Sequence, residues 1–132
     1  CGSRGDAISH VLSERGCSVT TNDINRMLPA DGHMDAASVE FVEHFLEEGR
    51  RPEWFVTSPP YRNALTFVKN ACRIATVGVA FKLRLSFLEP VVSRAQWLTE
   101  NPPSTVIVLS RAMYRGRQSS GVEAWFVWKV QQ

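Results

Sequence analysis

The chain has 132 residues, of which 44% are hydrophobic and 21% charged, proportions typical of one ordinary globular domain. A formal charge of +2 is too small to indicate nucleic-acid binding by itself. Three cysteines without C-x-x-C spacing, together with three histidines that share no ligand spacing, predict neither a disulfide framework nor a metal site. We therefore expect a reduced, cytoplasmic protein. No apolar run is long enough to cross a membrane, and no signal-peptide pattern opens the chain.

Strand and helix patterns alternate along the chain, which indicates βαβ units and a mostly parallel α/β sheet. In the first part, the pattern predicts a helix at about 6–15, a short strand at 17–21 and a helix at about 37–48. The second part is expected to hold strands at 53–57, 77–87, 104–109 and 123–130, with helices at 63–76 and at about 90–99. The last two strands, joined by a basic loop, are predicted to close the sheet as an antiparallel hairpin.

The most informative stretch is Ser58-Pro59-Pro60-Tyr61, which lies between the predicted strand 53–57 and the predicted helix 63–76. Open α/β sheets place their chemistry at such strand-to-helix corners. Two prolines fix φ twice and remove two N–H donors, so the corner is rigid and its carbonyls can accept bonds from a ligand. A rigid turn without a chemical role is the alternative interpretation.

In this context Ser58-Pro59-Pro60-Tyr61 resembles the catalytic motif of the amino methyltransferases. These enzymes transfer a methyl group from S-adenosylmethionine to the exocyclic nitrogen of adenine or cytosine, and their motif is Asp, Asn or Ser, then Pro-Pro and an aromatic residue. The resemblance implies that the Ser58 oxygen and the Pro59 carbonyl accept the two N–H bonds of the amine, which directs its lone pair toward the methyl group. Tyr61 would stack on the unstacked base. Ser58 leaves adenine N6 and cytosine N4 as alternatives.

From Cys1 to Val130 the order of elements is similar to the Rossmann-like class I methyltransferase fold, and 54–61, 84–89 and 124–128 look like small phage or mobile-element DNA methyltransferases. The family's first central strand would lie before Cys1. We therefore expect a single methyltransferase-like domain over 1–132, truncated at its N-terminus relative to the family, whose sheet lacks that strand. A homodimer or a strand-swapped assembly is one way to fill the gap.

The resemblance also implies a place for S-adenosylmethionine. The family's Gly-rich turn, where the backbone approaches the methionine part of the cofactor, corresponds to Gly2, Ser3 and Gly5. Asp23 follows the predicted strand 17–21 and lies eighteen residues after Gly5 (23 − 5), close to the usual interval of about twenty, which suits a ribose-binding carboxylate. A solvated turn aspartate is the alternative. Asp35 resembles the position near the adenine amine, and an N-cap for the helix at 37–48 is an equally good interpretation.

The loop between the last two strands interleaves basic residues with an aromatic one: Arg111, Tyr114, Arg115 and Arg117. This pattern suits a phosphate backbone and an unstacked base, although loops also attract arginine without ligands. Arg84 and Ser86, near the end of the strand 77–87, are candidates to line the same cleft, although such residues more often cover a sheet face. DNA is thus the expected partner, with RNA or protein amides as alternative substrates. The competing hypothesis is a non-catalytic methyltransferase-like remnant that binds nucleic acid or itself.

Overall fold

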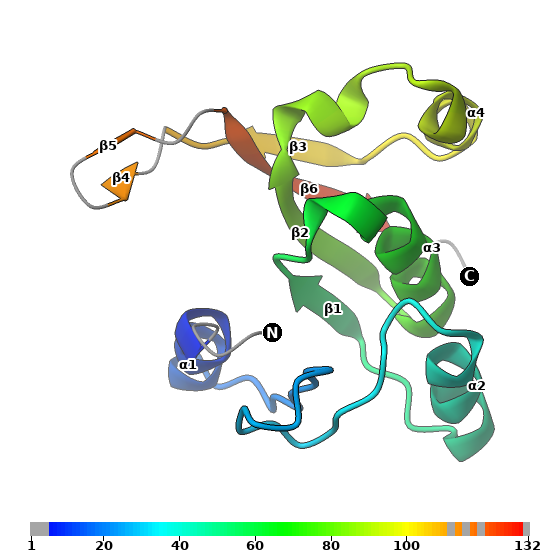
Figure 1. Cartoon of the computed structure of the whole chain (residues 1–132). Helices are drawn as coiled ribbons and strands as arrows, with labels where there is room; N and C mark the ends of the chain where they lie inside the picture. Colours follow the sequence, from blue (N-terminus) through cyan, green and yellow to red (C-terminus); the bar gives the residue numbers. More distant parts are fainter. Residues whose placement is uncertain (1–5, 111–112, 115–116, 119–120, 131–132) are drawn as a thin grey trace. The chain divides into compact units, whose positions relative to one another are not determined.

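The computed structural model describes residues 6–110, 113–114, 117–118 and 121–130 (Figure 1). The side chains of Asp6 and of the hairpin residues 113–114 and 117–118 lie outside that description. The chain divides into two compact units, Cys1–Arg50 and Arg51–Gln132, and each is described by itself. The single domain over 1–132 stays a prediction.

The first unit contains the helices α1 (Asp6–Glu14) and α2 (Val39–Glu48). The hydroxyl of Ser38 accepts a hydrogen bond from the N–H of Phe41 and so caps the start of α2. Gly49 ends this helix at φ +67°, a left-handed conformation that favours glycine. Asp35 is therefore not the N-cap. Its Oδ1 accepts from the N–H of Ala37 at 2.9 Å, in the turn that precedes the helix.

The segment between the two helices is a loop closed by side chains, so the prediction of a strand at 17–21 is wrong. The backbone forms only one isolated parallel bridge there, between Asn22 and Gly32. Asn22 exchanges two hydrogen bonds with the backbone of Met34, at 2.9 and 3.0 Å. Asp31 Oδ2 accepts from the N–H of Thr21 at 2.8 Å, which lowers the pKa of Asp31. The loop thus satisfies its polar groups with its own Asn and Asp side chains instead of a neighbouring strand.

The second unit is built on a four-stranded sheet of order β1-β2-β6-β3. β1 (Trp54–Thr57) pairs in parallel with β2 (Gly78–Arg84), while β6 (Glu123–Lys129) runs antiparallel to both β2 and β3 (Thr105–Val108). β1, β2 and β3 therefore point the same way, and β6 is reversed. The expectation of an α/β sheet whose last two long strands pair antiparallel is confirmed. The sheet is mixed and not mostly parallel as predicted, because two of its three strand pairings are antiparallel. β1 and β3 are its two edges.

Several elements end differently from the predictions. The strand predicted to reach residue 87 ends at Arg84, and the chain turns into the 3₁₀ helix η2 (Leu85–Leu88). This turn brings the ring of Phe87 into edge contact with Phe126, at 5.8 Å between centroids, and with Trp128, at 6.2 Å. α4 (Val92–Glu100) starts two residues after Pro90. The basic loop contains a short hairpin of β4 (Met113–Tyr114) and β5 (Arg117–Gln118).

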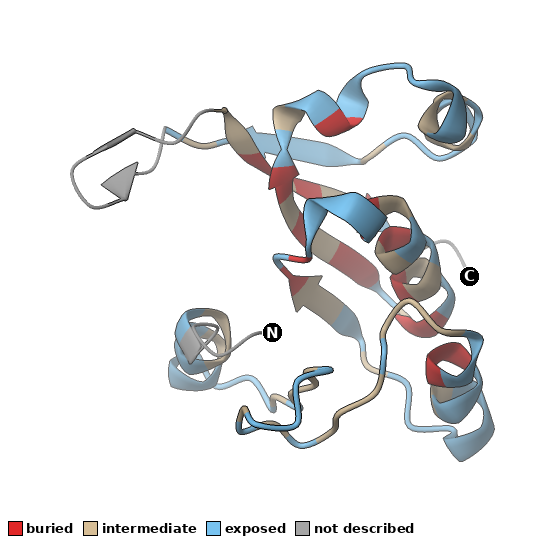
Figure 2. Ribbon diagram, in the orientation of Figure 1, coloured by how far each residue is buried: buried red, intermediate tan, exposed pale blue. Residues whose placement is uncertain are grey.

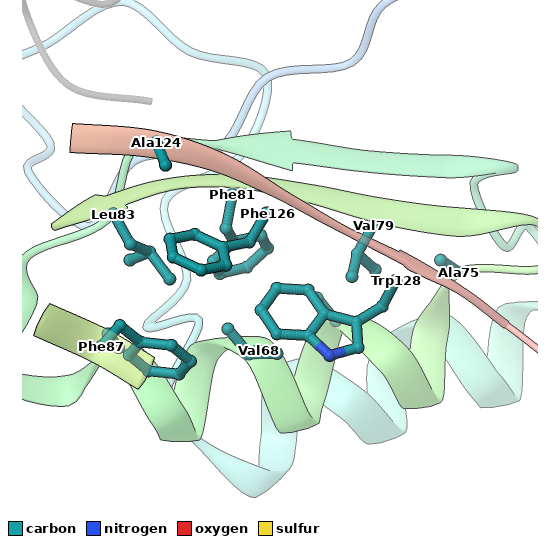
Figure 3. Close-up of a cluster of buried hydrophobic side chains, with 11 residues drawn as sticks. Val68, Ala75, Val79, Phe81, Leu83, Phe87, Ala124, Phe126 and Trp128 are labelled. Atoms are coloured by element: carbon teal, nitrogen blue, oxygen red, sulfur yellow. The ribbon is translucent and has the colours of Figure 1, made fainter. Parts of the chain in front are cut away.

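The hydrophobic core of the second unit lies between one face of the sheet and α3 (Ala64–Ile74), as Figure 3 shows. Buried residues in this unit concentrate on β2, β6 and α3 (Figure 2). They alternate along the strands, because successive strand residues point to opposite faces of a sheet: Val79, Phe81 and Leu83 on β2, and Ala124, Phe126 and Trp128 on β6.

Gly78 opens β2 where its backbone passes close to two aromatic residues. A Cβ at this position would lie 2.7 Å from Cζ3 of Trp54 and 2.9 Å from the carbonyl oxygen of Trp128. The indole of Trp54 is covered on one side by Lys129, whose Nζ lies 4.8 Å from the ring centroid. Glycine is therefore needed here to let the edge strand β1 approach β2.

Candidate active site at the Pro-Pro corner

Ser58, Pro59 and Pro60 connect the carboxyl end of β1 to the 3₁₀ helix η1 (Tyr61–Asn63), which leads into α3. Thr57 and Pro59 are buried, whereas Ser58, Pro60 and Tyr61 are exposed. Pro60 has φ −58° and ψ 136°, the extended conformation that the proline ring favours. The corner is thus anchored by two buried residues, and it lies between a strand and a helix as the sequence indicates.

Ser58 presents a hydroxyl that is available to a ligand. The side chain is exposed and has no hydrogen-bond partner in the part of the chain that the structure describes. Because Pro59 and Pro60 have no N–H, the backbone at these positions offers acceptors without competing donors. An amine with two N–H bonds therefore finds two classes of acceptor at the corner, a side-chain oxygen and backbone carbonyls.

Tyr61 is held in place by groups from two strands. Its hydroxyl donates to Oε1 of Glu123 at 2.8 Å, and Lys82 Nζ lies 3.2 Å from the other oxygen of that carboxylate. The guanidinium of Arg84 lies over the Tyr61 ring, 4.7 Å from its centroid. Arg84 and Glu123 are direct partners in the register of β2 and β6, which brings both to the end of the sheet at which β1 also ends.

This cluster shifts the ionisation of its members. Burial raises the pKa of Tyr61, and the hydrogen bond to Glu123 and its negative charge raise it further. For Glu123, burial acts to raise the pKa. The hydrogen bonds from Tyr61 and Lys82 and the positive charges of Lys82 and Arg84 outweigh it, so the pKa of Glu123 lies below its ordinary value of 4.5. At neutral pH the tyrosine is therefore protonated and donates to an ionised carboxylate.

A cavity of about 170 Å³ lies beside Tyr61. Apolar and polar side chains line it together: Tyr61, Ala64, Leu83, Arg84, Ser86, Phe87 and Arg94. Arg94, in α4, is half-buried and fixed to η2. Its Nε donates to the carbonyl of Phe87 at 3.1 Å, its Nη2 donates to the carbonyl of Ser86 at 3.3 Å, and its guanidinium lies 5.3 Å from the centre of the Phe87 ring. Two guanidinium groups thus line the same cavity.

The structure describes only some of the residues expected at the site. Arg84 lies next to Tyr61 and lines the cavity, together with Ser86. Asp23 and Asp35 belong to the first unit, where their Oδ1 atoms accept from the N–H groups of Asn25 and Ala37, each at 2.9 Å. The remaining expected residues lie outside the described residues, entirely or in their side chains: Gly2, Ser3, Gly5, Arg111, Tyr114, Arg115 and Arg117.

Lys82, Arg94 and Glu123 are site residues that the sequence did not predict. Lys82 and Glu123 look like ordinary polar positions of alternating strands, and only the pairing of β2 with β6 brings them to Tyr61. Arg94 looks like a surface residue of an amphipathic helix. Its approach to the cavity depends on the turn at η2, where the sequence predicts continued strand.

Among the described side chains, no three metal-ligating groups come together. Each histidine has a local partner: His10 lies 3.2 Å from Glu14, His44 lies 3.5 Å from Glu48, and His33 Nδ1 lies 2.9 Å from the carbonyl of Asp23. In the same part of the chain, no helix has the length and apolar character needed to cross a bilayer.

Comparison of the chain with family models, curated proteins and solved structures gives no match.

Proposed function

We propose that this chain transfers a methyl group from S-adenosylmethionine to the exocyclic amine of a DNA base, adenine N6 or cytosine N4. The observation that carries the proposal is the Ser58-Pro59-Pro60-Tyr61 corner at the carboxyl end of a parallel strand, with Ser58 exposed and Tyr61 held by Glu123. The sheet supports it, because parallel strands closed by an antiparallel C-terminal pair are what the resemblance to class I methyltransferases implies.

The corner suits the amine of an extruded base. The hydroxyl oxygen of Ser58 and the carbonyl of Pro59 each accept one N–H bond, so the nitrogen lone pair is withdrawn from the ring and oriented for attack. Tyr61 stacks on the base with the ring face that Arg84 does not cover. Ser58 is exposed, so water can take the proton that the nitrogen releases after its bond to carbon has formed. S-adenosylmethionine, when bound, supplies an electrophilic methyl group.

The carboxylates of the first unit fit the donors of this cofactor. Asp23 and Asp35 each use Oδ1 to accept a backbone N–H within a tight turn, which fixes the carboxylate. A carboxylate has about four acceptor positions, so each can also accept bonds from ribose hydroxyls or an adenine amine. Gly2, Ser3 and Gly5 would hold the methionine part.

Calorimetric titration with S-adenosylmethionine, followed by transfer of a labelled methyl group to duplex and single-stranded DNA, tests the proposal. We expect Ser58→Ala and Tyr61→Ala to reduce transfer by roughly 100-fold or more while cofactor binding and circular dichroism stay unchanged. Ser93→Ala, at an exposed serine of α4 that does not line the cavity beside Tyr61, is the matched control. Undiminished transfer by Ser58→Ala would show that the chemistry lies elsewhere.

A second candidate is a nucleic-acid-binding domain without transferase activity. The observation that favours it is that Arg84 and Arg94 line one cavity beside the corner, since phosphate binding by these side chains needs no cofactor. This candidate predicts salt-sensitive DNA binding, with no heat of cofactor binding even at millimolar S-adenosylmethionine. Label transfer to DNA would exclude it.

A further inference from the structure

We propose that the cavity beside Tyr61 binds a phosphodiester group of the substrate strand through Arg84, Arg94 and Ser86. The inference rests on the proposed function, because it assumes a nucleic-acid substrate at the corner. It adds a contact to the phosphate backbone, made by residues outside the Ser58-Pro59-Pro60-Tyr61 corner. Tyr61 belongs to both the corner and the cavity wall, so a base stacked on its ring and the phosphate beside that base occupy adjoining places.

The charges of the cavity select an anion. Two arginines and two hydroxyl-bearing residues, Ser86 and Tyr61, line it, and none of its lining residues is acidic. Glu123, the carboxylate that contacts Tyr61, is engaged by the Tyr61 hydroxyl and by Lys82. In the described part of the chain neither arginine makes a direct salt bridge with an acidic residue, although the charge of Arg84 acts on the nearby Glu123 carboxylate. An incoming phosphate therefore does not have to displace an internal salt bridge.

The two arginines are positioned before a ligand arrives. Arg94 is fixed by two backbone carbonyls and by the Phe87 ring, and Arg84 lies on the Tyr61 ring. A guanidinium has five N–H donors, of which Arg94 uses two in these bonds, so donors remain for the oxygens of a phosphate. Planar, pre-oriented guanidinium groups lose little freedom on binding a phosphate.

The size and the apolar lining agree with this ligand. A water needs only about 10–15 Å³, so a cavity of about 170 Å³ has room for a phosphate group and part of its sugar. Ala64, Leu83 and Phe87 supply apolar contacts for the sugar. Free phosphate and nucleotides share the chemistry of the phosphate group, but the adjoining Tyr61 favours a strand that continues past the target base.

The test uses the full chain and a fluorescein-labelled single-stranded oligodeoxynucleotide of about 12 nucleotides, in the range of known single-strand site sizes. We expect Arg84→Met and Arg94→Met each to weaken binding by about 10-fold, as expected for loss of a charge-assisted hydrogen bond. Each substitution should also reduce the steepness with which the logarithm of the binding constant falls with the logarithm of salt concentration, by about 0.7. The control is Arg73→Met, on the exposed side of α3 and outside the cavity, with less than a 2-fold effect.

A second measurement leaves the protein unchanged and is therefore independent of any unfolding of the Arg94 variant. In it, single phosphodiesters of the oligonucleotide are replaced, one at a time, by neutral methylphosphonate linkages. We expect one linkage to weaken binding to the unsubstituted protein by about 10-fold and to have no such effect on Arg84→Met. The proposal would be overturned if every methylphosphonate linkage weakened oligonucleotide binding equally. It would also be overturned if Arg73→Met weakened binding as much as Arg84→Met does. Displacement of the oligonucleotide by equimolar inorganic phosphate or deoxyadenosine monophosphate would assign the cavity to free phosphate instead and so overturn it too.

The oligonucleotide-binding test and the methyl-transfer assay can fail independently, so their results distinguish the phosphate contact from methylation. Linkage-specific binding without any label transfer would support the phosphate contact and reject methylation. Label transfer with oligonucleotide binding unchanged in Arg84→Met and Arg94→Met would support methylation and reject the phosphate contact.

Discussion

The hydroxyl of Tyr61 lies 2.8 Å from Oε1 of Glu123, a residue 62 positions further along the chain. This bond ties the corner at the end of β1 to the first residue of β6, although these two strands are not neighbours in the sheet. Lys82 and Arg84, from the strand between them, contact the same pair. The orientation of the Tyr61 ring therefore depends on β6, the last strand in the sequence.

Removing only the hydroxyl of Tyr61 separates its hydrogen bond to Glu123 from the proposed stacking of its ring on a base. We expect Tyr61→Phe to lower the free energy of unfolding by about 1 kcal/mol, because one hydrogen bond is lost and the Glu123 carboxylate loses a donor. The stacking face remains, so methyl transfer should fall far less than in Tyr61→Ala. Urea unfolding and initial transfer rates measure the two effects. Equal losses of transfer in both variants would contradict a role for the ring face.

The depressed pKa of Glu123 predicts how its contribution to stability depends on pH. A carboxylate with a lower pKa in the folded state stabilises the fold above its unfolded value of about 4.5, and this contribution is lost as pH falls through the folded pKa. We expect Glu123→Gln to be less stable than the unsubstituted protein at pH 7. The difference should shrink as pH is lowered from 5 toward 3. Urea midpoints at several pH values test this, and a difference independent of pH would contradict it.

Gly78→Ala should destabilise the sheet, because the added Cβ would overlap the Trp54 ring at 2.7 Å and the Trp128 carbonyl at 2.9 Å. Overpacking of this kind costs about 1–3 kcal/mol. Gly121→Ala is the matched control, since its Cβ would find its nearest contact at 4.0 Å, from Arg84 Cδ. Chemical denaturation of the two variants measures the contrast. Equal stability would show that β1 can move away from β2 at no cost.

The two described cysteines should differ in reactivity toward iodoacetamide. Burial raises the pKa of Cys72 to about 11, so only about a thousandth of this thiol is ionised at pH 8. Cys17 is exposed. We expect mass spectrometry of peptides to show rapid labelling at Cys17 and labelling at Cys72 only after addition of denaturant. Rapid labelling of Cys72 in the native protein would contradict the packing of this α3 residue against the hydrophobic core.

Local patterns predicted the second unit well, because its strands alternate cleanly. Phe81 and Leu83 face the core while Lys82 between them does not, and the same period marks β6. The strand-to-helix corner also follows from local signals, since an apolar strand, two prolines and a helical pattern occur in sequence. These features depend only on neighbouring residues, so the chain order is enough to find them.

Features set by distant partners were not predictable in this way. The segment 17–21 contains β-branched residues that favour a strand, yet Asn22 and Asp31 bond across the loop and replace the strand pairing. The alternation through Leu85 and Phe87 suggests a longer β2, but contacts of the Phe87 ring with Phe126 and Trp128 accompany a 3₁₀ turn. The approach of Glu123 to Tyr61 likewise depends on the register of β2 with β6.

The outer edge of the sheet has a consequence for the behaviour of the protein at high concentration. All four residues of β3 are exposed, with Ile107 at 51% and Val108 at 58%, and neither a charge nor a proline interrupts the strand. Natural sheets usually protect such edges, because an uncharged edge strand is a template for pairing with another chain. Precipitation on concentration should therefore start at β3. A lysine in place of Ile107 should raise the solubility limit without affecting the corner at the opposite side of the sheet.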